Sequence, residues 1–92
     1  MVITFRILEA KMIVKVVYFA VYADLLNKRH EEVEINEHTN VSSLFKHCTA
    51  GLDNQDRLLK STVFAVNEEY VDPLRVLNDG DEVVFIPPVS GG

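Results

Sequence analysis

Residues 64–92 read FAVNEEYVDPLRVLNDGDEVVFIPPVSGG, and they contain the clearest strand and turn signals of the chain. Within it, the β-branched and aromatic run EVVFI at 82–86 predicts a strand. Pro87 and Pro88 end that strand, because a proline has no N–H to donate to a sheet. The residues that follow, 89–92, have no capacity to pack, so we expect a flexible tail that ends in two glycines.

The earlier part of this stretch predicts a strand and two turns. TVFAVNEEYV at 62–71 indicates one strand to Val66, a turn at 67–69 and a short continuation through Tyr70 and Val71. The sequence NDGD at 78–81 is a strong turn signal, with Asp79 and Asp81 expected to serve turn geometry and solubility. We therefore expect three strands in this part of the chain.

A further strand opens the N-terminal half. IVKVVYFA at 13–20 is too short and too rich in valine for a helix, so it predicts a strand. One face of this strand is apolar and the other is mixed; the first consists of Val14, Val16, Tyr18 and Ala20, and the second of Ile13, Lys15, Val17 and Phe19. The helical spacing of Tyr22, Leu25 and Leu26 predicts a short helix over 21–29. Alternation around Val33 and Ile35 then predicts a strand with one solvated face.

The clearest helix begins after Asn40, which is a good N-cap residue. Its apolar stripe, at i, i+3, i+4 and i+7, consists of Val41, Leu44, Phe45 and Cys48. Gly51 supplies the expected stop, and 53–61 is expected to be a loop with one helical turn whose Leu58 and Leu59 touch the core. This order of elements indicates an α+β domain in which a mixed sheet is crossed by one main helix, and the ubiquitin-like β-grasp is the natural candidate.

Composition restricts the possible functions. A chain of 92 residues has material for one small core. Its net charge of −5, with scattered Lys and Arg, argues against nucleic-acid binding. No apolar run approaches the roughly 20 residues that a bilayer span needs, so we expect no membrane partner. A single cysteine cannot form an internal disulfide, which fits a reducing cytosol.

The Cys and His residues give no sign of a metal site, because they share no ligand spacing. Cys48 is expected to pack as a small apolar residue on the main helix rather than to relay sulfur. His30, His38 and His47 are expected to be solvated. No nucleophilic motif or phosphate-binding glycine loop is present, so the chain is expected to catalyse nothing on its own.

The tail is the one segment whose sequence suggests chemistry. Two prolines stiffen its exit from the sheet, and four residues beyond them reach about 13 Å. Glycine lacks a Cβ, so a narrow channel in another protein can close around the backbone. The alternative is that two terminal glycines merely fray.

The motifs just quoted resemble the C-terminal third of molybdopterin synthase sulfur-carrier subunits. In that family a Val-Asn turn, a Leu-x-x-Gly-Asp-Glu-Val segment and a terminal Pro-Pro-Val-Ser/Thr-Gly-Gly follow one another, here at Val66–Asn67, 77–83 and 87–92. VKVVYFA and the helix after Asn40 match the family more loosely. The resemblance implies a β-grasp fold, adenylation of Gly92 by an ATP-using activating enzyme, and a thiocarboxylate that donates sulfur to cyclic pyranopterin monophosphate, forming the dithiolene of the molybdenum cofactor.

The resemblance also assigns roles to individual residues and partners. Gly92 carries the glycyl adenylate and then the thioglycine, and the tail that threads into the partner consists of Pro87, Pro88, Val89, Ser90 and Gly91. Phe19, Tyr70 and Ile86 correspond to the family's partner-facing apolar residues. The partners are the large catalytic subunit, in a heterotetramer of two small and two large subunits, and the activating enzyme. No cofactor is expected to stay bound, and ATP is used only by that enzyme.

The same resemblance divides the chain into an N-terminal extension at 1–11, a β-grasp domain at 12–88 and a reactive tail at 89–92. Met12 stands where family members begin, so 1–11 is expected to be an extension, an upstream start, a disordered arm or an extra strand. Three other functions stay open: a sulfur carrier for thiamine or for tRNA thiolation, a ubiquitin-like modifier joined to lysines, and a binding module with an incidental Gly-Gly end.

Overall fold

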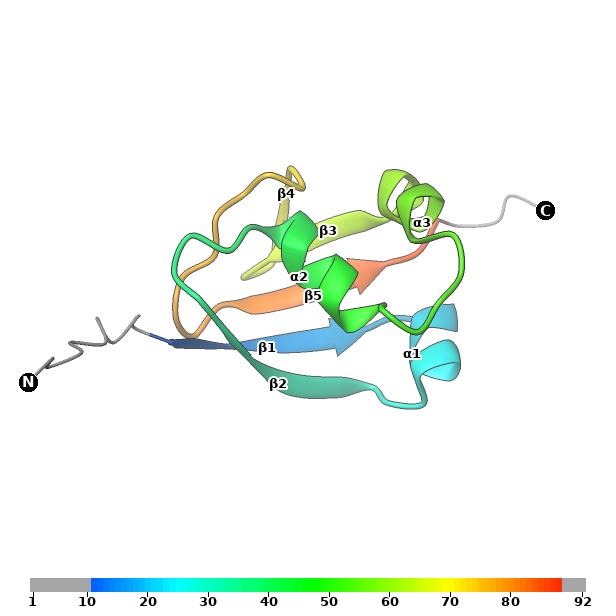
Figure 1. The fold of residues 1–92 in the computed structure, drawn as a ribbon, viewed down its shortest axis with the longest axis horizontal. Helices are drawn as coiled ribbons and strands as arrows, with labels where there is room; N and C mark the ends of the chain where they lie inside the picture. Colours follow the sequence, from blue (N-terminus) through cyan, green and yellow to red (C-terminus); the bar gives the residue numbers. More distant parts are fainter. Residues whose placement is uncertain (1–10, 89–92) are drawn as a thin grey trace, which may run out of the picture.

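The computed structural model describes residues 11–88, which form one five-stranded sheet and three helices (Figure 1). The elements in chain order are β1 (Met12–Tyr18), α1 (Val21–Leu26), β2 (His30–Ile35), α2 (Val41–Cys48), α3 (Gln55–Ser61), β3 (Val63–Val66), β4 (Glu69–Val71) and β5 (Glu82–Ile86). The strand order is β2-β1-β5-β3-β4, with β1 and β5 parallel and every other neighbouring pair antiparallel. The predicted mixed sheet is therefore confirmed.

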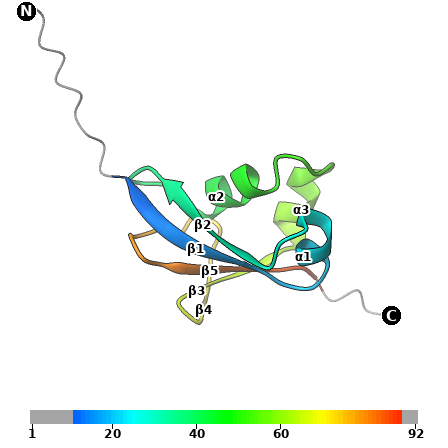
Figure 2. The same ribbon diagram turned by 90° about the horizontal axis from the view of Figure 1, so that it is seen from below.

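One face of the sheet is covered and the other is open. Helix α2 crosses the covered face, while α1 and α3 lie at the end of the sheet from which the chain leaves β5 (Figures 1 and 2). No helix of residues 11–88 lies over the opposite face (Figure 2). We call this opposite side the open face.

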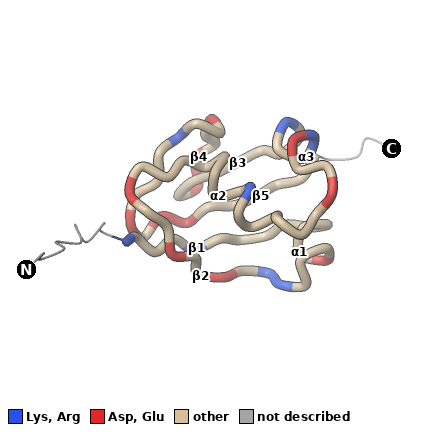
Figure 3. The backbone as a smooth tube through the Cα atoms, in the orientation of Figure 1, with Lys and Arg blue, Asp and Glu red and all other residues tan. Residues whose placement is uncertain are grey.

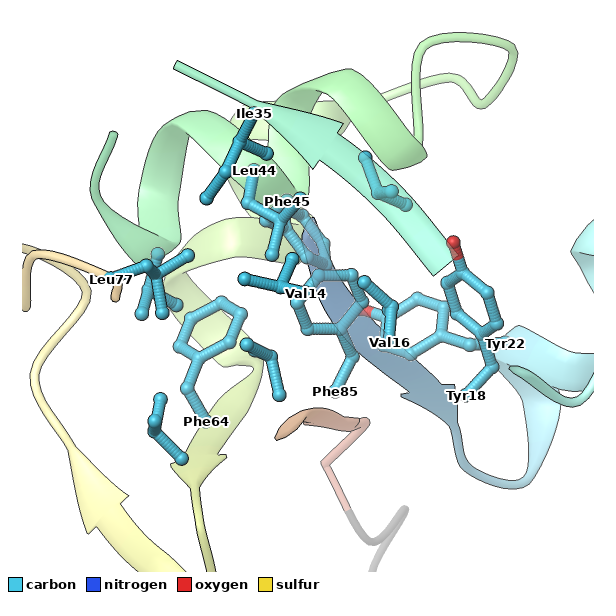
Figure 4. Close-up of a cluster of buried hydrophobic side chains, with 14 residues drawn as sticks. Val14, Val16, Tyr18, Tyr22, Ile35, Leu44, Phe45, Phe64, Leu77 and Phe85 are labelled. Carbon is cyan, nitrogen blue, oxygen red and sulfur yellow. The ribbon is translucent and has the colours of Figure 1, made fainter. Parts of the chain in front are cut away.

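Phe45 is at the centre of the core between α2 and the sheet (Figure 4). Its ring is fully buried and lies edge-on to three other rings, with centroid distances of 5.8 Å to Tyr22, 5.4 Å to Phe64 and 5.1 Å to Phe85. Such aromatic pairs stabilise a core beyond the area that they bury. Helix α2 is held at its start because the Asn40 side chain accepts a hydrogen bond of 2.8 Å from the Ser43 N–H, as its N-cap position predicts.

Several predicted boundaries were wrong. The strand predicted over 13–20 ends at Tyr18, and Ala20, expected on the apolar face, is exposed at the corner before α1. The helix predicted over 21–29 ends at Leu26, because Asn27 takes a left-handed conformation and closes it. In both places the apolar spacing of the sequence continues beyond the residue at which the backbone turns. Spacing alone therefore predicted an element that was too long.

The region after α2 also differs from prediction. Gly51 does not end α2, which stops at Cys48; Thr49 caps it, and the Thr49 hydroxyl donates to the Phe45 carbonyl at 2.7 Å. The segment 53–61, predicted as a loop with one helical turn, contains the complete helix α3. Most residues of α3 are polar, so no apolar stripe predicted a helix in this segment. Leu58 and Leu59 pack against the core, as expected.

Asp81 joins the turn before β5 to the turn between β3 and β4. Its two carboxylate oxygens accept hydrogen bonds of 2.8 Å from the Asn67 side-chain amide and from the Asn78 N–H. Asp79 accepts another of 2.8 Å from the Ile13 N–H. Turn geometry is thus confirmed for both residues, but Asp81 is only 6 % exposed and does not serve solubility.

Candidate functional site

The candidate site begins where the chain leaves the sheet. Strand β5 ends at Ile86, and Pro87 and Pro88 continue past α1 and α3 (Figure 1). The predicted reactive residues beyond them, namely Val89, Ser90, Gly91 and Gly92, lie outside the described residues. So does the N-terminal extension, apart from Lys11, which pairs with Glu34 at 3.1 Å.

An apolar groove of about 660 Å³ lies beside this exit. We call it the tail-exit groove; its lining consists of Phe19, Ala20, Val21, Tyr22, Leu25, Leu58, Ile86, Pro87 and Pro88. Phe19, Val21 and Leu25 are each about half exposed in the isolated chain. None of the lining residues carries a charge, so the groove fits an apolar surface or a backbone segment of a partner better than a charged ligand.

The walls of the groove are fixed to each other by a buried hydrogen-bond chain. The Thr62 hydroxyl donates to the Leu58 carbonyl of α3, and the Tyr22 hydroxyl of α1 lies 2.6 Å from the Thr62 oxygen. Tyr22 is fully buried, and breaking its bond would leave a polar atom without a partner. Helices α1 and α3 are thereby held at a fixed separation on either side of the exit.

Beside the groove, apolar residues of neighbouring strands lie next to one another on the open face. One row crosses the sheet from β1 through β5 and β3 to β4 and consists, in that order, of Val17, Val84, Ala65 and Tyr70. In the next row, nearer the exit, Val63 pairs with Ile86, and the Phe19 N–H donates to the Phe85 carbonyl at 3.2 Å. We call these residues together the open-face strip: Val17, Phe19, Val63, Ala65, Tyr70, Val84 and Ile86.

The three residues predicted to face a partner all fall on this strip. Phe19 is 49 % exposed and shares the tail-exit groove with the half-buried Ile86. Tyr70 is 80 % exposed and lies on β4, at the far edge of the same face. The structure thus brings Phe19 and Ile86 together and places Tyr70 apart from them on the same face of the sheet. Their role in binding stays a prediction.

The open-face strip ends at charged residues on the side that lies away from the exit of the chain at Pro87. Lys15 pairs across the open face with Glu32 on β2 and Glu82 on β5, and its ammonium lies 3.8 Å from the Glu82 carboxylate. From Val16 to Ala20 and from Val83 to Ile86 there is no charged residue, and the corresponding ends of β1 and β5 are tan in Figure 3. The open face is therefore apolar near the tail and polar at the other end.

Sequence reasoning missed Val17, Val63, Ala65 and Val84, which complete the strip, and it did not foresee the groove. Val17 stood on the mixed face of its strand, but a single strand does not reveal which residues of distant strands lie beside it. The sequence holds one signal for the groove: Val21 and Leu25 are four residues apart, so they lie on the same side of α1.

Cys48 lies in a cluster that keeps its thiol protonated. Burial raises the pKa of the Cys48 thiol above its ordinary value; the neighbouring Tyr18 hydroxyl offsets part of this rise, and the smaller effects of the Glu31 and Lys28 charges oppose each other. Tyr18 donates its hydroxyl proton to Glu31, and burial together with that bond raises the pKa of Tyr18. A protonated thiol is a weak nucleophile, so the cluster supports a structural role for Cys48, which is partly rather than fully buried.

The described residues hold no group of three or more His, Cys, Asp or Glu side chains that could bind a metal ion. His30, His38 and His47 are exposed, as expected. No helix within 11–88 has the length and apolar character needed to cross a membrane.

Comparison with known proteins agrees with the resemblance seen in the sequence. The ThiS family matches residues 16–92 of the chain. The molybdopterin synthase sulfur carrier subunit of Chlamydomonas reinhardtii is 37 % identical over 83 residues, which cover 88 % of this chain and all of that protein.

Solved structures share the fold. A putative molybdopterin converting factor subunit 1 from Pyrococcus furiosus superposes with a TM-score of 0.68 at 29 % identity, covering 85 % of this chain and 99 % of that one. The complex of subunits 1 and 2 of the molybdopterin-converting factor from Helicobacter pylori 26695 contains a chain with a TM-score of 0.58 at 24 % identity, covering 88 % of this chain and all of that one. The predicted β-grasp fold is confirmed.

Proposed function

This chain belongs to the ThiS family, and we propose that it is the sulfur carrier subunit of a molybdopterin synthase, with Gly92 as the residue that carries the sulfur. The observation that best supports the proposal is the apolar surface around the tail. The open-face strip and the tail-exit groove form one continuous surface next to Pro87 and Pro88, so a partner that docks there also meets the C-terminus. The 37 % identity to a protein named as such a carrier supports the pterin branch over the thiamine and tRNA branches.

The chemistry at Gly92 requires two enzymes and one carrier. A carboxylate is a poor electrophile, so the activating enzyme first joins the Gly92 carboxylate to the α-phosphate of ATP and releases pyrophosphate. A sulfur nucleophile then displaces AMP from the acyl adenylate and leaves a thiocarboxylate. Each transfer delivers one sulfur to cyclic pyranopterin monophosphate, and water supplies the oxygen that regenerates the Gly92 carboxylate, so the two sulfurs of one dithiolene consume two thiocarboxylates. The chain contributes the reactive end and its presentation, and the partners contribute the catalytic groups.

We propose the large synthase subunit as the partner that covers the open-face strip. The Helicobacter pylori complex contains subunits 1 and 2 of a molybdopterin-converting factor, which supports a two-subunit assembly here as well. The proposed anchors are Phe19, Tyr70 and Ile86. The free energy of binding at an interface concentrates in a few aromatic and large apolar residues. Two carriers with two large subunits is the proposed stoichiometry.

The test is synthase activity with altered ends of the chain. Purified large subunit, activating enzyme, ATP, a sulfide source and precursor are combined with the full chain, with a chain lacking Gly92, or with a chain extended by one serine after Gly92. We expect dithiolene product only with the full chain, because both alterations remove the Gly92 carboxylate from the end of the tail. A chain that begins at Met12 is the matched control and is expected to stay active. Product formation by the Gly92 deletion would contradict the proposal.

A further inference from the structure

A polar hollow of about 530 Å³ lies on the open face, beside the first residues of β2. Val17 and Phe19, which belong to the open-face strip, are part of its lining. His30 of β2 is the register partner of Val17, and directly paired residues of neighbouring strands share a face. The His30 side chain therefore continues the first row of the strip onto β2. We call this the β2-side hollow; its charged lining residues are Lys15, Asp24 and Arg29.

Cations outnumber carboxylates in the β2-side hollow. Lys15 and Arg29 are positively charged at neutral pH, and Asp24 is the one carboxylate among the described lining residues. Lys15 already has two carboxylate neighbours, because it is the register partner of Glu32 on β2 and of Glu82 on β5. Arg29 forms no ion pair with any residue that the structure describes. It is therefore the cation of the hollow that still lacks an anionic partner.

Lys28, the residue before Arg29, is by contrast paired locally. Its ammonium lies 3.1 Å from the Glu31 carboxylate. The two basic residues form the blue stretch that precedes β2 in Figure 3. A guanidinium presents several N–H donors in a planar fork, which matches the two oxygens of a carboxylate. Arg29 is exposed, so its donors are accessible beside the apolar strip.

A partner that covers Val17 and Phe19 also closes over the hollow, because both residues line it. Closure removes water from around the Arg29 guanidinium, and a cation that loses water without gaining an anion costs free energy. A partner that supplies a negative group at this point therefore binds better than one that does not. Apolar contacts are non-directional, whereas a charge pair at one side of the strip also fixes the orientation in which the partner docks.

We propose that the β2-side hollow receives a carboxylate side chain of the large synthase subunit, with Arg29 as the residue that binds it. The carboxylate oxygens accept hydrogen bonds from the Arg29 guanidinium, and the Lys15 ammonium adds attraction at longer range. This inference rests on the proposed function, since the large subunit is the partner proposed for the open-face strip. It adds to the apolar anchors a residue that selects an acidic partner surface over a neutral or basic one.

The first test measures affinity for the large subunit with two charge reversals. Arg29→Glu changes the hollow, whereas Lys46→Glu changes the net charge equally but lies on α2, which covers the opposite face of the sheet. Both residues are exposed, so both variants are expected to keep the thermal midpoint of the wild type. At about 0.05 M salt we expect Arg29→Glu to bind about 20-fold more weakly and Lys46→Glu to stay within about twofold of the wild type. At about 0.5 M salt the loss in Arg29→Glu should fall below about fivefold.

The conservative variant Arg29→Lys keeps the charge without the planar fork. It is expected to bind within about fivefold of the wild type at the lower salt concentration. Equal affinities of Arg29→Glu and Lys46→Glu would overturn the proposal, because only the net charge would then matter. A loss in Arg29→Glu that salt does not reduce would also overturn it, since the contact would not be a charge pair.

The second test uses the carrier alone, with a tetraglutamate peptide as the probe. Adding the peptide to the isotope-labelled chain is expected to shift the NMR signals of the Arg29 Nε–H and the His30 backbone amide, and a tetralysine peptide is expected to shift neither. Lys46→Glu should keep the His30 shift and Arg29→Glu should lose it. Absent shifts in the wild type, or a His30 shift that persists in Arg29→Glu, would overturn the proposal. If the large subunit does not bind the wild-type chain, the proposed function fails, and the peptide titration still decides whether the hollow binds a carboxylate.

Discussion

The two faces of the central strands differ in what covers them. On one face of β1, Val14, Val16 and Tyr18 are buried beneath the helices, and on β5 the same is true of Val83 and Phe85. On the other face, Val17 of β1 and Val84 and Ile86 of β5 belong to the open-face strip and stay partly exposed. Apolar side chains on the first face contribute to folding, whereas those on the second contribute little until a partner covers them. Mutations on the two faces should therefore have separable effects.

The largest effect is expected in the covered core. Phe45→Ala removes the ring that contacts Tyr22, Phe64 and Phe85 and leaves a cavity, so unfolding free energy should fall by about 3–5 kcal/mol. That is a large part of the 5–15 kcal/mol typical of a small domain, as urea denaturation would show. A loss below about 1 kcal/mol would mean that the core is not organised around this ring.

The second effect is expected in binding rather than in stability. Phe19→Ala should weaken affinity for the large subunit by roughly 30-fold, or about 2 kcal/mol, and change unfolding free energy by less than about 1 kcal/mol. Titration calorimetry and denaturation of the same sample measure both quantities. Leu74→Ala is the control, because Leu74 is 72 % exposed but lies outside the strip, and it should alter neither. Equal binding losses for Phe19→Ala and Leu74→Ala would remove the distinction between the strip and the rest of the surface.

A smaller effect is expected at Cys48, which lies on the covered side. Cys48→Ala should cost about 1 kcal/mol of stability through lost packing and leave sulfur loading unchanged. Loading is measured as the fraction of carrier that becomes thiocarboxylated in the presence of the activating enzyme. If that fraction falls to background while the variant stays folded, Cys48 takes part in sulfur transfer and the division between the two faces breaks down.

The smallest effect is a pH dependence at Glu31. Burial raises the pKa of this carboxyl, but the hydrogen bond from Tyr18 and the Lys28 ammonium at 3.1 Å outweigh it, so the pKa lies below its ordinary value of 4.5. A lowered pKa stabilises the fold above the unfolded-state pKa, and this contribution disappears as the pH falls through the folded-state value. Wild type should exceed Glu31→Gln in unfolding free energy by up to about 1 kcal/mol at pH 7, and this difference should shrink steadily as the pH falls below 4.5. A difference that does not shrink over this range would indicate a packing effect.

A feature of the fold or of the candidate site could be predicted from the sequence when residues close together in the chain determine it. The cap at Asn40, the strand at 82–86 and the alternation of Val14, Val16 and Tyr18 are local patterns, and the structure confirms them. The burial of Asp81 depends on its contact with Asn67 in a distant turn, so no local pattern revealed it. The open-face strip required the register of β1 with β5 and of β5 with β3, which pairs residues far apart in the chain.

The central claim, that Gly92 carries sulfur, is tested most directly by intact mass. The purified chain is incubated with ATP, the activating enzyme and a sulfur source, and the whole chain and its C-terminal peptide are weighed by mass spectrometry. Exchange of one carboxylate oxygen for sulfur raises the mass by about 16 Da, and we predict this gain on the peptide that ends at Gly92. An unchanged mass, with an activating enzyme proven competent on another carrier, would contradict the claim and favour a binding module with an incidental Gly-Gly end.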